Sequence, residues 1–414
     1  MRKVLSIKQQ AELFDNILQQ RLDDLLPTLM KRQGISMWIV MNREYNEDPV
    51  YLSLVPAMAR YARRLSCLIF YLNGQGKTER YSLGNDRDFK GMYTVIPWAP
   101  PQDRMQLLRE TIERLNPDNI ALDYCQDNQF ADGLSKSLYD MFKAGMSPEI
   151  MAKVISAEHI VTDWLQTRNR QELVRYRAVN ALAKEIIEEC FSSKVITPGV
   201  TTTADVEWAL MEAVSEQGLE CWFTPTVDLQ RKGCPGGRIR DEVILPGDML
   251  HCDFGLKYLG LCTDTQRIFY VPRPGETQPP AYLQRAYENT LRFMDIVAEN
   301  CITGRTGDEI LTASVEQAKG EGLRPHLYTH PIGVHGHAAG PTIGLFYKDG
   351  PVGGMGEYPL YPNTCYALEL NTKVSVPEWD DDELWVMREE TVCFKEDGKL
   401  EYLMEDHDVF KLVQ

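Results

Sequence analysis

Two aspartates in one short, mostly apolar stretch constrain this chain more than any other feature of its sequence. Asp253 and Asp264 lie eleven residues apart within HCDFGLKYLGLCTDTQR, residues 251–267. If this stretch is a hairpin that turns at Tyr258-Leu259, the two carboxylates lie directly opposite each other on one face. Two like charges that close need a bound cation, a shared proton or open water. The fold must therefore supply one of these three.

A second pair of acids follows near the C-terminus. Glu369 lies in an otherwise apolar strand sequence, and Glu389 lies in a second apolar run further along the chain. A hairpin centred near Trp379 places these two glutamates opposite each other across a strand pair. The alternative is that both are solvated acids on an edge strand. In the first case the chain has two hairpins, each with a facing pair of carboxylates.

Histidines concentrate in one further segment. Four of the chain's seven histidines fall in HLYTHPIGVHGHAAGP, residues 326–341, and they are His326, His330, His335 and His337. The glycines and prolines argue against a regular helix and favour a loop or an irregular strand. A lone histidine is more often structural, but imidazole is also a common ligand of Zn, Mn, Fe and Co.

Four carboxylates and one imidazole can hold two divalent cations, with some carboxylates bridging them. Oxygen-rich ligation of this kind favours Mn, Fe, Co or Zn in a two-metal hydrolytic site. Cys252 and Cys262 flank the two aspartates, but the harder oxygen ligands beside them predict that both are core residues. The ten cysteines form no CxxC pair and are expected to be reduced.

Charge and hydropathy limit the partners of this protein. The chain has 414 residues and a net charge of −16, which disfavours nucleic acid and anionic membrane surfaces as partners. No apolar run is long enough to span a membrane. The start, MRKVLSIKQQAELF, lacks an apolar signal core. We therefore expect a cytoplasmic protein without nucleic-acid or membrane partners, and a trimmed signal peptide is the alternative for its location.

The length predicts two domains, and the apolar periodicity predicts an α+β fold. The polar stretch QTRNRQ, residues 166–171, marks the boundary between a domain of residues 1–165 and one of residues 166–414. The first domain is predicted as mixed α/β, with helices over 8–32 and near 105–115 and strands over 37–41, 67–72 and 119–122. The second is predicted to contain helices over 179–191, from Thr202 or Thr203 to Gly218, over 280–300 and over 308–321, and strands over 248–254, 262–271, 365–376 and 384–394.

Taken together, these residues resemble the creatinase, prolidase, aminopeptidase P and methionine aminopeptidase superfamily. In that superfamily five metal ligands occur in the order Asp, Asp, His, Glu, Glu, and the two aspartates are eleven residues apart. Its ligand histidine begins an HxxGxxxH stretch, matched here from His330 to His337, and prolidase-like members carry another histidine four residues earlier, matched by His326. The ligand order is matched by Asp253, Asp264, His330, Glu369 and Glu389.

The resemblance implies a fold and an activity. It implies a pita-bread catalytic domain at residues 166–414, preceded by a creatinase-type α/β N-terminal domain at residues 1–165. The implied function is that of a dinuclear metal-dependent peptidase, which hydrolyses short peptides with a hydroxide that bridges the metals. Aminopeptidase, Xaa-Pro aminopeptidase and prolidase-like activities all fit. The implied cofactors are two divalent ions, Mn first, with Co, Zn and Fe as alternatives, and the implied assembly is a homodimer.

The same resemblance assigns roles to the metal ligands. Asp264 and Glu389 would bridge the two metals. Asp253 would complete one coordination sphere, and His330 with Glu369 would complete the other. Glu369 would also act as a general base or proton shuttle.

Three other histidines receive substrate-related roles. His337 would orient the scissile carbonyl or stabilise the oxyanion, and His326 would line the pocket for the departing residue. Strand alternation places His251 on the same face as Asp253. We hypothesise that His251 partly replaces a histidine that the family usually has upstream, by hydrogen-bonding a ligand or reaching substrate. The alternative is a buried structural histidine bonded to the backbone.

The sequence departs from the family pattern around the ligands. Peptidases of the family have a histidine about seventeen residues before the first Asp, whereas residues 234–238 here contain none. The usual Glu-Pro-Gly after the fourth ligand is Glu369-Leu370-Asn371, and a usual tyrosine shortly after it is Lys373. The arginine two residues before the last ligand is Met387, with Arg388 one place off.

The metal ligands are therefore intact while the residues expected to touch substrate differ. Two alternatives to an Xaa-Pro peptidase follow from this difference. The first is a two-metal hydrolase of another amide or C–N bond. The second is a catalytically weak binding protein that keeps the fold.

Overall fold

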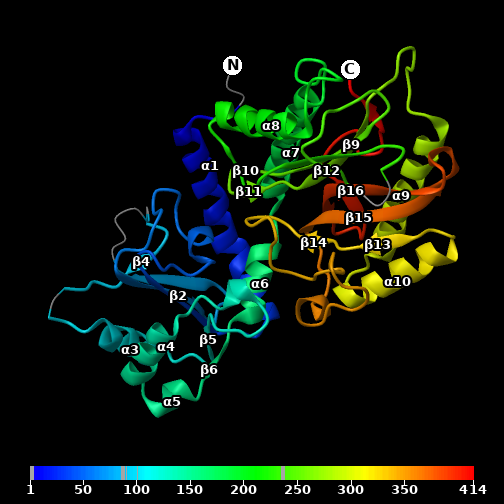
Figure 1. The fold of residues 1–414 in the computed structure, drawn as a ribbon. Coiled ribbons are helices and arrows are strands. Elements are labelled where there is room, and N and C mark those ends of the chain that lie inside the picture. The colour runs from blue at the N-terminus through cyan, green and yellow to red at the C-terminus, as the bar shows by residue number, and fades with distance from the viewer. Residues whose placement is uncertain (1–3, 85–88, 90, 100, 235–237) are drawn as a thin grey trace. The chain divides into compact units, whose positions relative to one another are not determined.

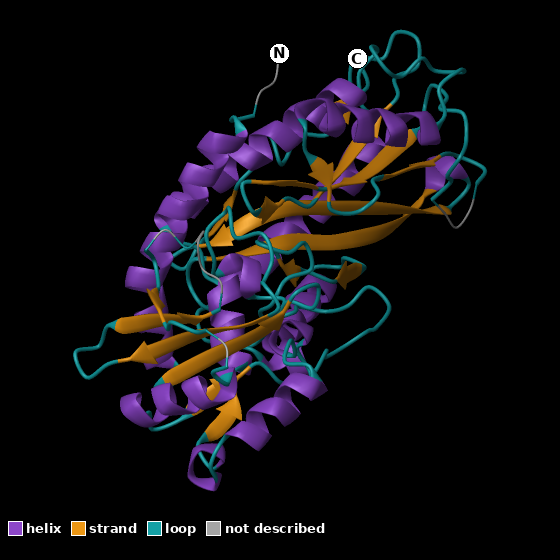
Figure 2. Cartoon of the chain, turned by 90° about the vertical axis from the view of Figure 1, so that its left-hand side faces the viewer, coloured by secondary structure: helices purple, strands orange, loops and turns teal. Residues whose placement is uncertain are grey.

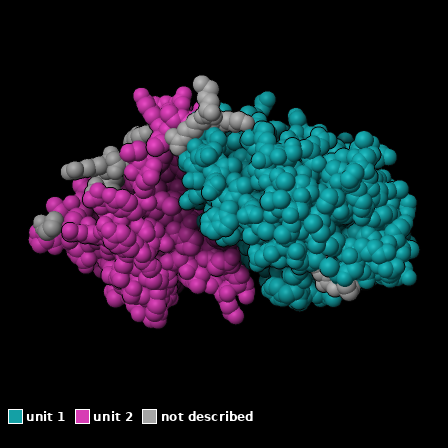
Figure 3. All heavy atoms as spheres, turned by 45° about the horizontal axis from the view of Figure 1, so that its top comes forward, with its two compact units in different colours: residues 1–4, 166–414 teal, residues 5–165 magenta. Residues whose placement is uncertain are grey.

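The computed structural model describes residues 4–84, 89, 91–99, 101–234 and 238–414 (Figure 1). Within it the chain divides into two compact units, one of residues 5–165 and one that contains residues 166–414 (Figure 3). No helix of the described residues is long and apolar enough to cross a membrane.

The N-terminal unit is a six-stranded sheet with helices, in the order β4-β3-β2-β1-β5-β6. Its strands are β1 (Met37–Arg43), β2 (Leu65–Leu72), β3 (Thr78–Leu83), β4 (Thr94–Val95), β5 (Ile120–Leu122) and β6 (Val154–Ser156). Its α-helices are α1 (Ile7–Gln20), α2 (Leu26–Arg32), α3 (Arg104–Leu115), α4 (Lys136–Gly145), α5 (Pro148–Met151) and α6 (Glu158–Gln166). Short 3₁₀ turns lie at η2 (Tyr51–Ser53) and η3 (Gln129–Ala131).

The predicted helix over residues 8–32 is present, but a π-helical segment, η1 (Arg21–Leu25), divides it. Pro27 follows this segment within the first turn of α2, and its missing backbone N–H interrupts the hydrogen-bond ladder of the helical run at this point. The strands predicted over 37–41, 67–72 and 119–122 are confirmed as β1, β2 and β5. The unit is therefore mixed α/β, as the periodicity predicts.

The C-terminal unit has a large sheet in the order β13-β15-β16-β12-β9-β8, to which three short strands add, and a three-stranded sheet β11-β10-β7. Its strands are β7 (Glu220–Cys221), β8 (Thr226–Gln230), β9 (Met249–Phe254), β10 (Leu256–Tyr258), β11 (Leu261–Cys262), β12 (Thr265–Tyr270), β13 (Pro325–Leu327), β14 (His330–Pro331), β15 (Thr364–Val376), β16 (Asp382–Phe394), β17 (Leu400–Tyr402) and β18 (Lys411–Leu412). Its helices are α7 (Arg170–Cys190), α8 (Thr203–Gln217), α9 (Ala281–Asn300), α10 (Gly307–Gly320) and the 3₁₀ turns η4 (Gly354–Glu357) and η5 (Pro377–Trp379).

Helices cover one face of this sheet (Figure 2). Leu368 and Leu370 of β15 pack with Phe293 of α9 and Ile310 of α10 in one apolar cluster. Because side chains alternate along a strand, the intervening residue Glu369 points to the opposite face. Glu369 therefore lies on the face of β15 that is turned away from α9 and α10.

The acidic hairpin turns one residue later than the sequence interpretation placed it. Tyr258 pairs with Leu261, so the turn consists of Leu259 and Gly260, which both have positive φ, at 54° and 76°. A tight turn with positive φ at both central residues favours glycine, and Gly260 supplies one at the second position. This shift in register makes Gln266, not Asp264, the partner of Asp253. The predicted direct facing of the two aspartates is therefore wrong.

The second acidic hairpin is confirmed. β15 and β16 pair over thirteen positions, from Thr364 opposite Phe394 to Val376 opposite Asp382, and Glu369 lies opposite Glu389. Glu389 also pairs with Gln266 of β12. Gln266 is thus the neighbour of Asp253 on one side and of Glu389 on the other, and it joins the acids of the two hairpins in one row across the sheet.

Candidate metal centre

Three of the five predicted ligands form a tight buried cluster. The ligand atoms of Asp264, His330 and Glu389 all lie within 4.8 Å of one another. His330 Nε2 is 3.6 Å from Asp264 Oδ2 and 3.6 Å from Glu389 Oε1. Two ligands of one cation lie at most about 4.4 Å apart when each bond is about 2.2 Å long. The two 3.6 Å separations from His330 therefore suit ligands of a shared cation.

The other two predicted ligands border this cluster. Glu369 Oε2 is 4.0 Å from His330 Nε2. Asp253 is partly exposed, although its Oδ1 atom is buried. It lies in the same row of the sheet, separated from Glu389 by Gln266. The structure thus brings all five predicted ligands to one side of the C-terminal unit.

Local hydrogen bonds orient two of these side chains. His330 Nδ1 lies 3.0 Å from the carbonyl oxygen of Pro331 and donates its proton there, so Nε2 presents a lone pair to the carboxylates. Asp264 lies between β11 and β12, where the Thr391 hydroxyl contacts both its backbone N–H and its carbonyl oxygen. The backbone of Asp264 is therefore held against β16.

Burial and mutual repulsion of the carboxylates dominate the electrostatics of the cluster, and Arg238 only partly offsets them at Asp253 and Glu369. Burial, and after it the neighbouring carboxylates, raise the pKa of Asp264 and of Glu389 well above the usual range. Burial also raises the pKa of Asp253 to about 6 and that of Glu369 to about 8. Burial lowers the pKa of His330 to about 3, so this imidazole is neutral at pH 7. A protonated or cation-bound state of the carboxylates relieves the repulsion.

The donor atoms fit a divalent cation. Among the described residues, Asp253 Oδ1, Asp264 Oδ1, His330 Nε2 and Glu389 Oε1 are buried and have no hydrogen-bond partner. A buried polar atom without a partner costs about 1–3 kcal/mol, and a bound cation would remove this cost. Carboxylate oxygens and a neutral imidazole nitrogen are the ligands that divalent transition metals take.

The two substrate-related histidines lie in different places. The ring centroid of His337 is 4.6 Å from that of His330, so His337 borders the cluster. His326 lies away from it, on β13, where Nε2 is 2.9 Å from the carbonyl oxygen of Phe346 and Nδ1 is 3.6 Å from Asp349. The structure does not bring His326 into contact with the predicted ligands.

His251 is connected to the predicted ligands by side chains. It is buried, with Nδ1 3.0 Å from Asp228 Oδ2 and Nε2 2.9 Å from Gln266 Oε1. Gln266 in turn donates from Nε2 to Glu369 Oε1 at 2.5 Å. The partners of His251 are therefore side chains, not the backbone groups of the alternative interpretation.

Sequence reasoning missed two residues of this region. Buried Asp228 accepts from Arg238 Nη2 at 2.7 Å, and an aspartate within the apolar strand sequence TVDLQ was the available signal. Trp222 donates from Nε1 to the carbonyl oxygen of Thr263, and its ring centroid lies 5.4 Å from that of His337. No local pattern marks Trp222. The histidine-free segment noted upstream lies partly outside the described residues, at 235–237.

Arg388 belongs to another cluster. It alternates with Glu389 along β16 and faces the opposite side of the sheet, where its Nη2 is 2.5 Å from Glu390 Oε1. Arg267 also pairs with Glu390, at 3.0 Å. All three side chains of this cluster are buried. Arg388 is therefore a structural residue and does not replace the substrate-side arginine of the family.

We expect the metal-free protein to lose stability as pH rises from about 5 to about 8. The raised pKa values of Asp253 and Glu369 mean that the folded state binds more protons than the unfolded state in this range. Stability must then fall with rising pH, by about 2–4 kcal/mol across this range. Urea unfolding in a chelating buffer at several pH values measures it. A saturating divalent cation should remove the fall, and a flat profile in chelator would contradict the expectation.

Comparison with known proteins identifies the family of this chain. The sequence profile of metallopeptidase family M24 matches residues 174–396, more than half of the chain. The chain belongs to metallopeptidase family M24. Family membership and the buried Asp/His/Glu cluster together support binding of a divalent metal.

Two curated Mycoplasma proteins show how far this likeness extends. A provisionally named Xaa-Pro aminopeptidase of Mycoplasma genitalium is 27% identical over 204 residues, which cover 45% of this chain and 56% of that protein. The chain thus spans about half the length of the curated relatives that it matches.

Two solved structures share the fold. The X-Pro aminopeptidase of Thermotoga maritima has a TM-score of 0.65 at 19% identity, covering 92% of this chain and 99% of its own. The N-terminal domain of the FACT complex subunit SPT16 from chickpea has a TM-score of 0.59 at 10% identity, covering 94% and 96%. The predicted two-domain α+β fold of the pita-bread superfamily is therefore confirmed. The chickpea protein is named as a complex subunit and not as a peptidase, so the shared fold alone does not establish an activity.

Proposed function

We propose that this M24 chain is a metal-dependent exopeptidase that removes the N-terminal residue from short peptides, with Xaa-Pro peptides as the first candidates. The observation that carries the proposal is the row of acids on adjacent strands, together with the four buried donor atoms that have no hydrogen-bond partner among the described residues. A binding protein that merely keeps the fold has no need for such a cluster, because unsatisfied buried acceptors destabilise it.

In this proposal two divalent cations are held by Asp253, Asp264, His330, Glu369 and Glu389, with Asp264 and Glu389 shared between them. Manganese is the first candidate, and cobalt, zinc and iron are the alternatives. When bound, such cations polarise a carbonyl oxygen and lower the pKa of a coordinated water.

The chain's own residues position substrate and move protons. Glu369 has one oxygen bound by Gln266 and the other facing His330, which supports the proposal that it would take and return a proton as a general base. His337, beside His330, would donate to the oxygen of the scissile carbonyl or of the tetrahedral oxyanion. His326 would line the path of the departing residue.

We expect His251→Ala to lower turnover at least tenfold, equivalent to about 1.4 kcal/mol of barrier. His251 would act as a positioning residue, because it holds the amide of Gln266 that in turn orients Glu369. Steady-state kinetics measures the loss, while metal content and melting temperature check that the centre and the fold persist. Turnover unchanged on a verified substrate would end this assignment.

The function itself is tested with a library of dipeptides and Xaa-Pro peptides, assayed with added Mn, Co or Zn. Release of the N-terminal residue in a metal-dependent manner is the expected result. Cleavage only of other amide or C–N bonds would identify a hydrolase of another class. Metal binding without any hydrolysis would favour a catalytically weak binding protein.

The remaining parts of the proposal concern organisation. We assign the metallohydrolase activity to residues 166–414, and residues 1–165 to a creatinase-type N-terminal domain. The proposed location is the cytoplasm, and the proposed assembly is a homodimer, since creatinase and prolidase relatives are commonly dimeric. Light scattering at micromolar concentration tests the dimer, and a monomer mass would contradict it.

A further inference from the structure

The sheet face that carries the proposed ligands continues beyond them in register. Along β15 and β16 the pair Glu369–Glu389 is followed on the same face by Asn371–Met387 and then by Lys373–Trp385. Each step of two residues along a strand is about 6.7 Å, so Lys373 lies about 13 Å along β15 from Glu369. These three residue pairs, which we call the polar strip, therefore lead away from the proposed metal centre.

The edge strand β13 adds residues to two of these rows, the Asn371–Met387 row and the Lys373–Trp385 row. His326 of β13 pairs with Asn371, and the backbone N–H of Lys373 donates to the carbonyl oxygen of Arg324. Alternation places Arg324 and His326 on the same face of the sheet. The outermost row thus contains Arg324, Lys373 and Trp385, which we call the cationic row.

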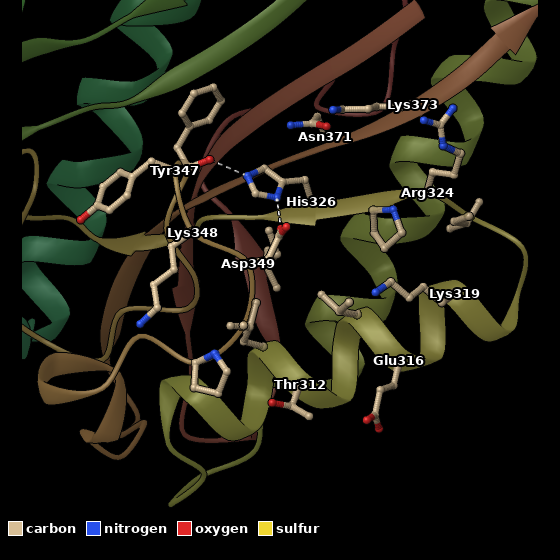
Figure 4. Close-up of a pocket in the computed structure, with 18 of the residues that line it drawn as sticks. Thr312, Glu316, Lys319, Arg324, His326, Tyr347, Lys348, Asp349, Asn371 and Lys373 are labelled. Carbon is tan, nitrogen blue, oxygen red and sulfur yellow. Dashed lines mark hydrogen bonds and ion pairs between the residues drawn. The ribbon is translucent and has the colours of Figure 1, made fainter. Parts of the chain in front are cut away.

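A cavity of about 930 Å³ opens over these rows, and its lining includes Arg324, His326, Asn371, Lys373 and Trp385. Figure 4 shows Asn371 and Lys373 above His326, with Arg324 on the same side of the cavity as Lys373. None of the five proposed metal ligands lines this cavity. Its lining on β15 therefore begins at Asn371, two residues along the strand from Glu369.

Asn371 has an unused acceptor in this cavity. Asn371 as a whole is 1% exposed, and its Nδ2 donates to the Tyr328 hydroxyl at 3.2 Å. Its Oδ1 is buried and has no hydrogen-bond partner among the described residues. A buried amide oxygen without a partner calls for a donor, and the N–H of an extended peptide supplies one.

The cationic row is ordered by an aromatic ring. Lys373 Nζ lies 3.7 Å from the centroid of the Trp385 ring, and no carboxylate of the described residues forms an ion pair with it. Arg324 pairs with Glu383 at 2.5 Å but keeps 58% of its side chain exposed. Because Arg324 is already paired with Glu383, Lys373 is the cation of this row that is left for an anionic group, in a chain with a net charge of −16.

We propose that this strip is an extended substrate subsite, in which Asn371 Oδ1 accepts a backbone N–H of the peptide and the cationic row binds a carboxylate about three residues beyond the scissile bond. This inference rests on the proposed exopeptidase function and names its substrate class: peptides of about four residues that carry either a free C-terminal carboxylate or an acidic side chain there.

The distance from the metal centre to Lys373 sets the length of the peptide. An extended peptide advances about 3.3–3.6 Å per residue, so about three residues span the distance from the metal centre to within reach of the lysine side chain. An enzyme that removes a single N-terminal residue leaves the longer part of its substrate on the departing side. That part is the one that needs an extended subsite.

The test separates binding from hydrolysis. Peptides with a reduced first bond cannot be hydrolysed there, so calorimetry with the manganese-loaded full chain measures their binding alone. Four versions of Ala-Pro-Ala-Xaa are compared: Xaa as alanine amide, alanine with a free carboxylate, glutamate amide and glutamine amide. At least one of the two anionic versions should bind about tenfold more tightly than its neutral counterpart, the size that one charge-assisted hydrogen bond supports. Which one does so identifies the source of the carboxylate.

Lys373→Met is the decisive variant, because methionine keeps the length and apolar stem of the side chain. It should abolish the preference for the anionic peptide and leave binding of the neutral amides unchanged. Lys348→Met is the matched control, since Lys348 lines the same cavity on its other side and is exposed (Figure 4). The control should keep the preference.

Three results would overturn the inference. They are equal binding of anionic and neutral peptides to the unsubstituted protein, a preference that survives in Lys373→Met, and a preference lost equally in Lys348→Met. Hydrolysis of the normal peptides is scored separately. Anionic preference without any hydrolysis would sink the exopeptidase proposal and leave the subsite standing.

Discussion

Replacing Asp264 by alanine is expected to abolish binding of both divalent cations and to lower peptidase activity by about a thousandfold or more. Asp264 is buried, its carboxylate lies 3.6 Å from His330 Nε2, and it is the proposed ligand of both cations. Isothermal titration calorimetry measures the metal stoichiometry. Asp264→Asn removes the same charge while keeping the size of the side chain. Asp397 is exposed, so Asp397→Ala is a control that should bind metal normally.

The Asp264→Asn variant should separate the effect of bound metal on stability from the effect of the buried carboxyl. A cation at about 100 times its dissociation constant stabilises the folded state by about 2.7 kcal/mol per site, so Asp264→Asn should melt at a lower temperature than the unsubstituted protein when metal is present. In chelator the order should be equal or reversed, because the substitution removes a buried carboxyl that its neighbours disfavour in the charged form. Unchanged metal stoichiometry in Asp264→Asn would refute the ligand assignment.

Replacing Glu390 by alanine is expected to destabilise the C-terminal unit by about 3–5 kcal/mol. Glu390 is fully buried and is the shared partner of Arg267 and Arg388, both also buried. Removing it leaves two guanidinium groups without their carboxylate in a region of low dielectric. Chemical denaturation monitored by tryptophan fluorescence measures the loss.

Glu401→Ala is the matched control for this prediction. Glu401 pairs with Arg177 at 2.5 Å, but 43% of the arginine side chain is exposed, so the loss should stay below about 1 kcal/mol. If Glu390→Ala lost no more than the control, the buried pair would contribute nothing measurable to stability.

Much of the secondary structure was predictable because it depends on local patterns. The capping box of Thr202 with Asp205 and the left-handed Gly218 begin and end α8 where those residues predict. The thirteen-residue strands β15 and β16 alternate so regularly that the facing of Glu369 and Glu389 could be read from the hairpin centre alone. Periodicity and caps depend on residues that are close together in the sequence. They can therefore be recognised without knowledge of the rest of the chain.

Register was harder to predict than the strands themselves. The acidic hairpin differs from the prediction by one residue, because the backbone conformation of Leu259 and Gly260 decides where it turns. One residue of shift replaces Asp264 by Gln266 opposite Asp253. The two aspartates nevertheless lie in the same region, because Thr391 of β16 holds the backbone of Asp264.

By itself, the sequence determined which residues are available as metal ligands, in which order, and on which kinds of element they lie. Only the tertiary structure decided that Gln266 joins the two hairpins, that Arg388 pairs with Glu390 on the far face, and that Lys373 lies on Trp385 in a cavity separate from the proposed ligands. The physical reason is that these contacts join strands distant along the chain. Their partners are set by sheet order and side-chain alternation across several strands, which no local pattern contains.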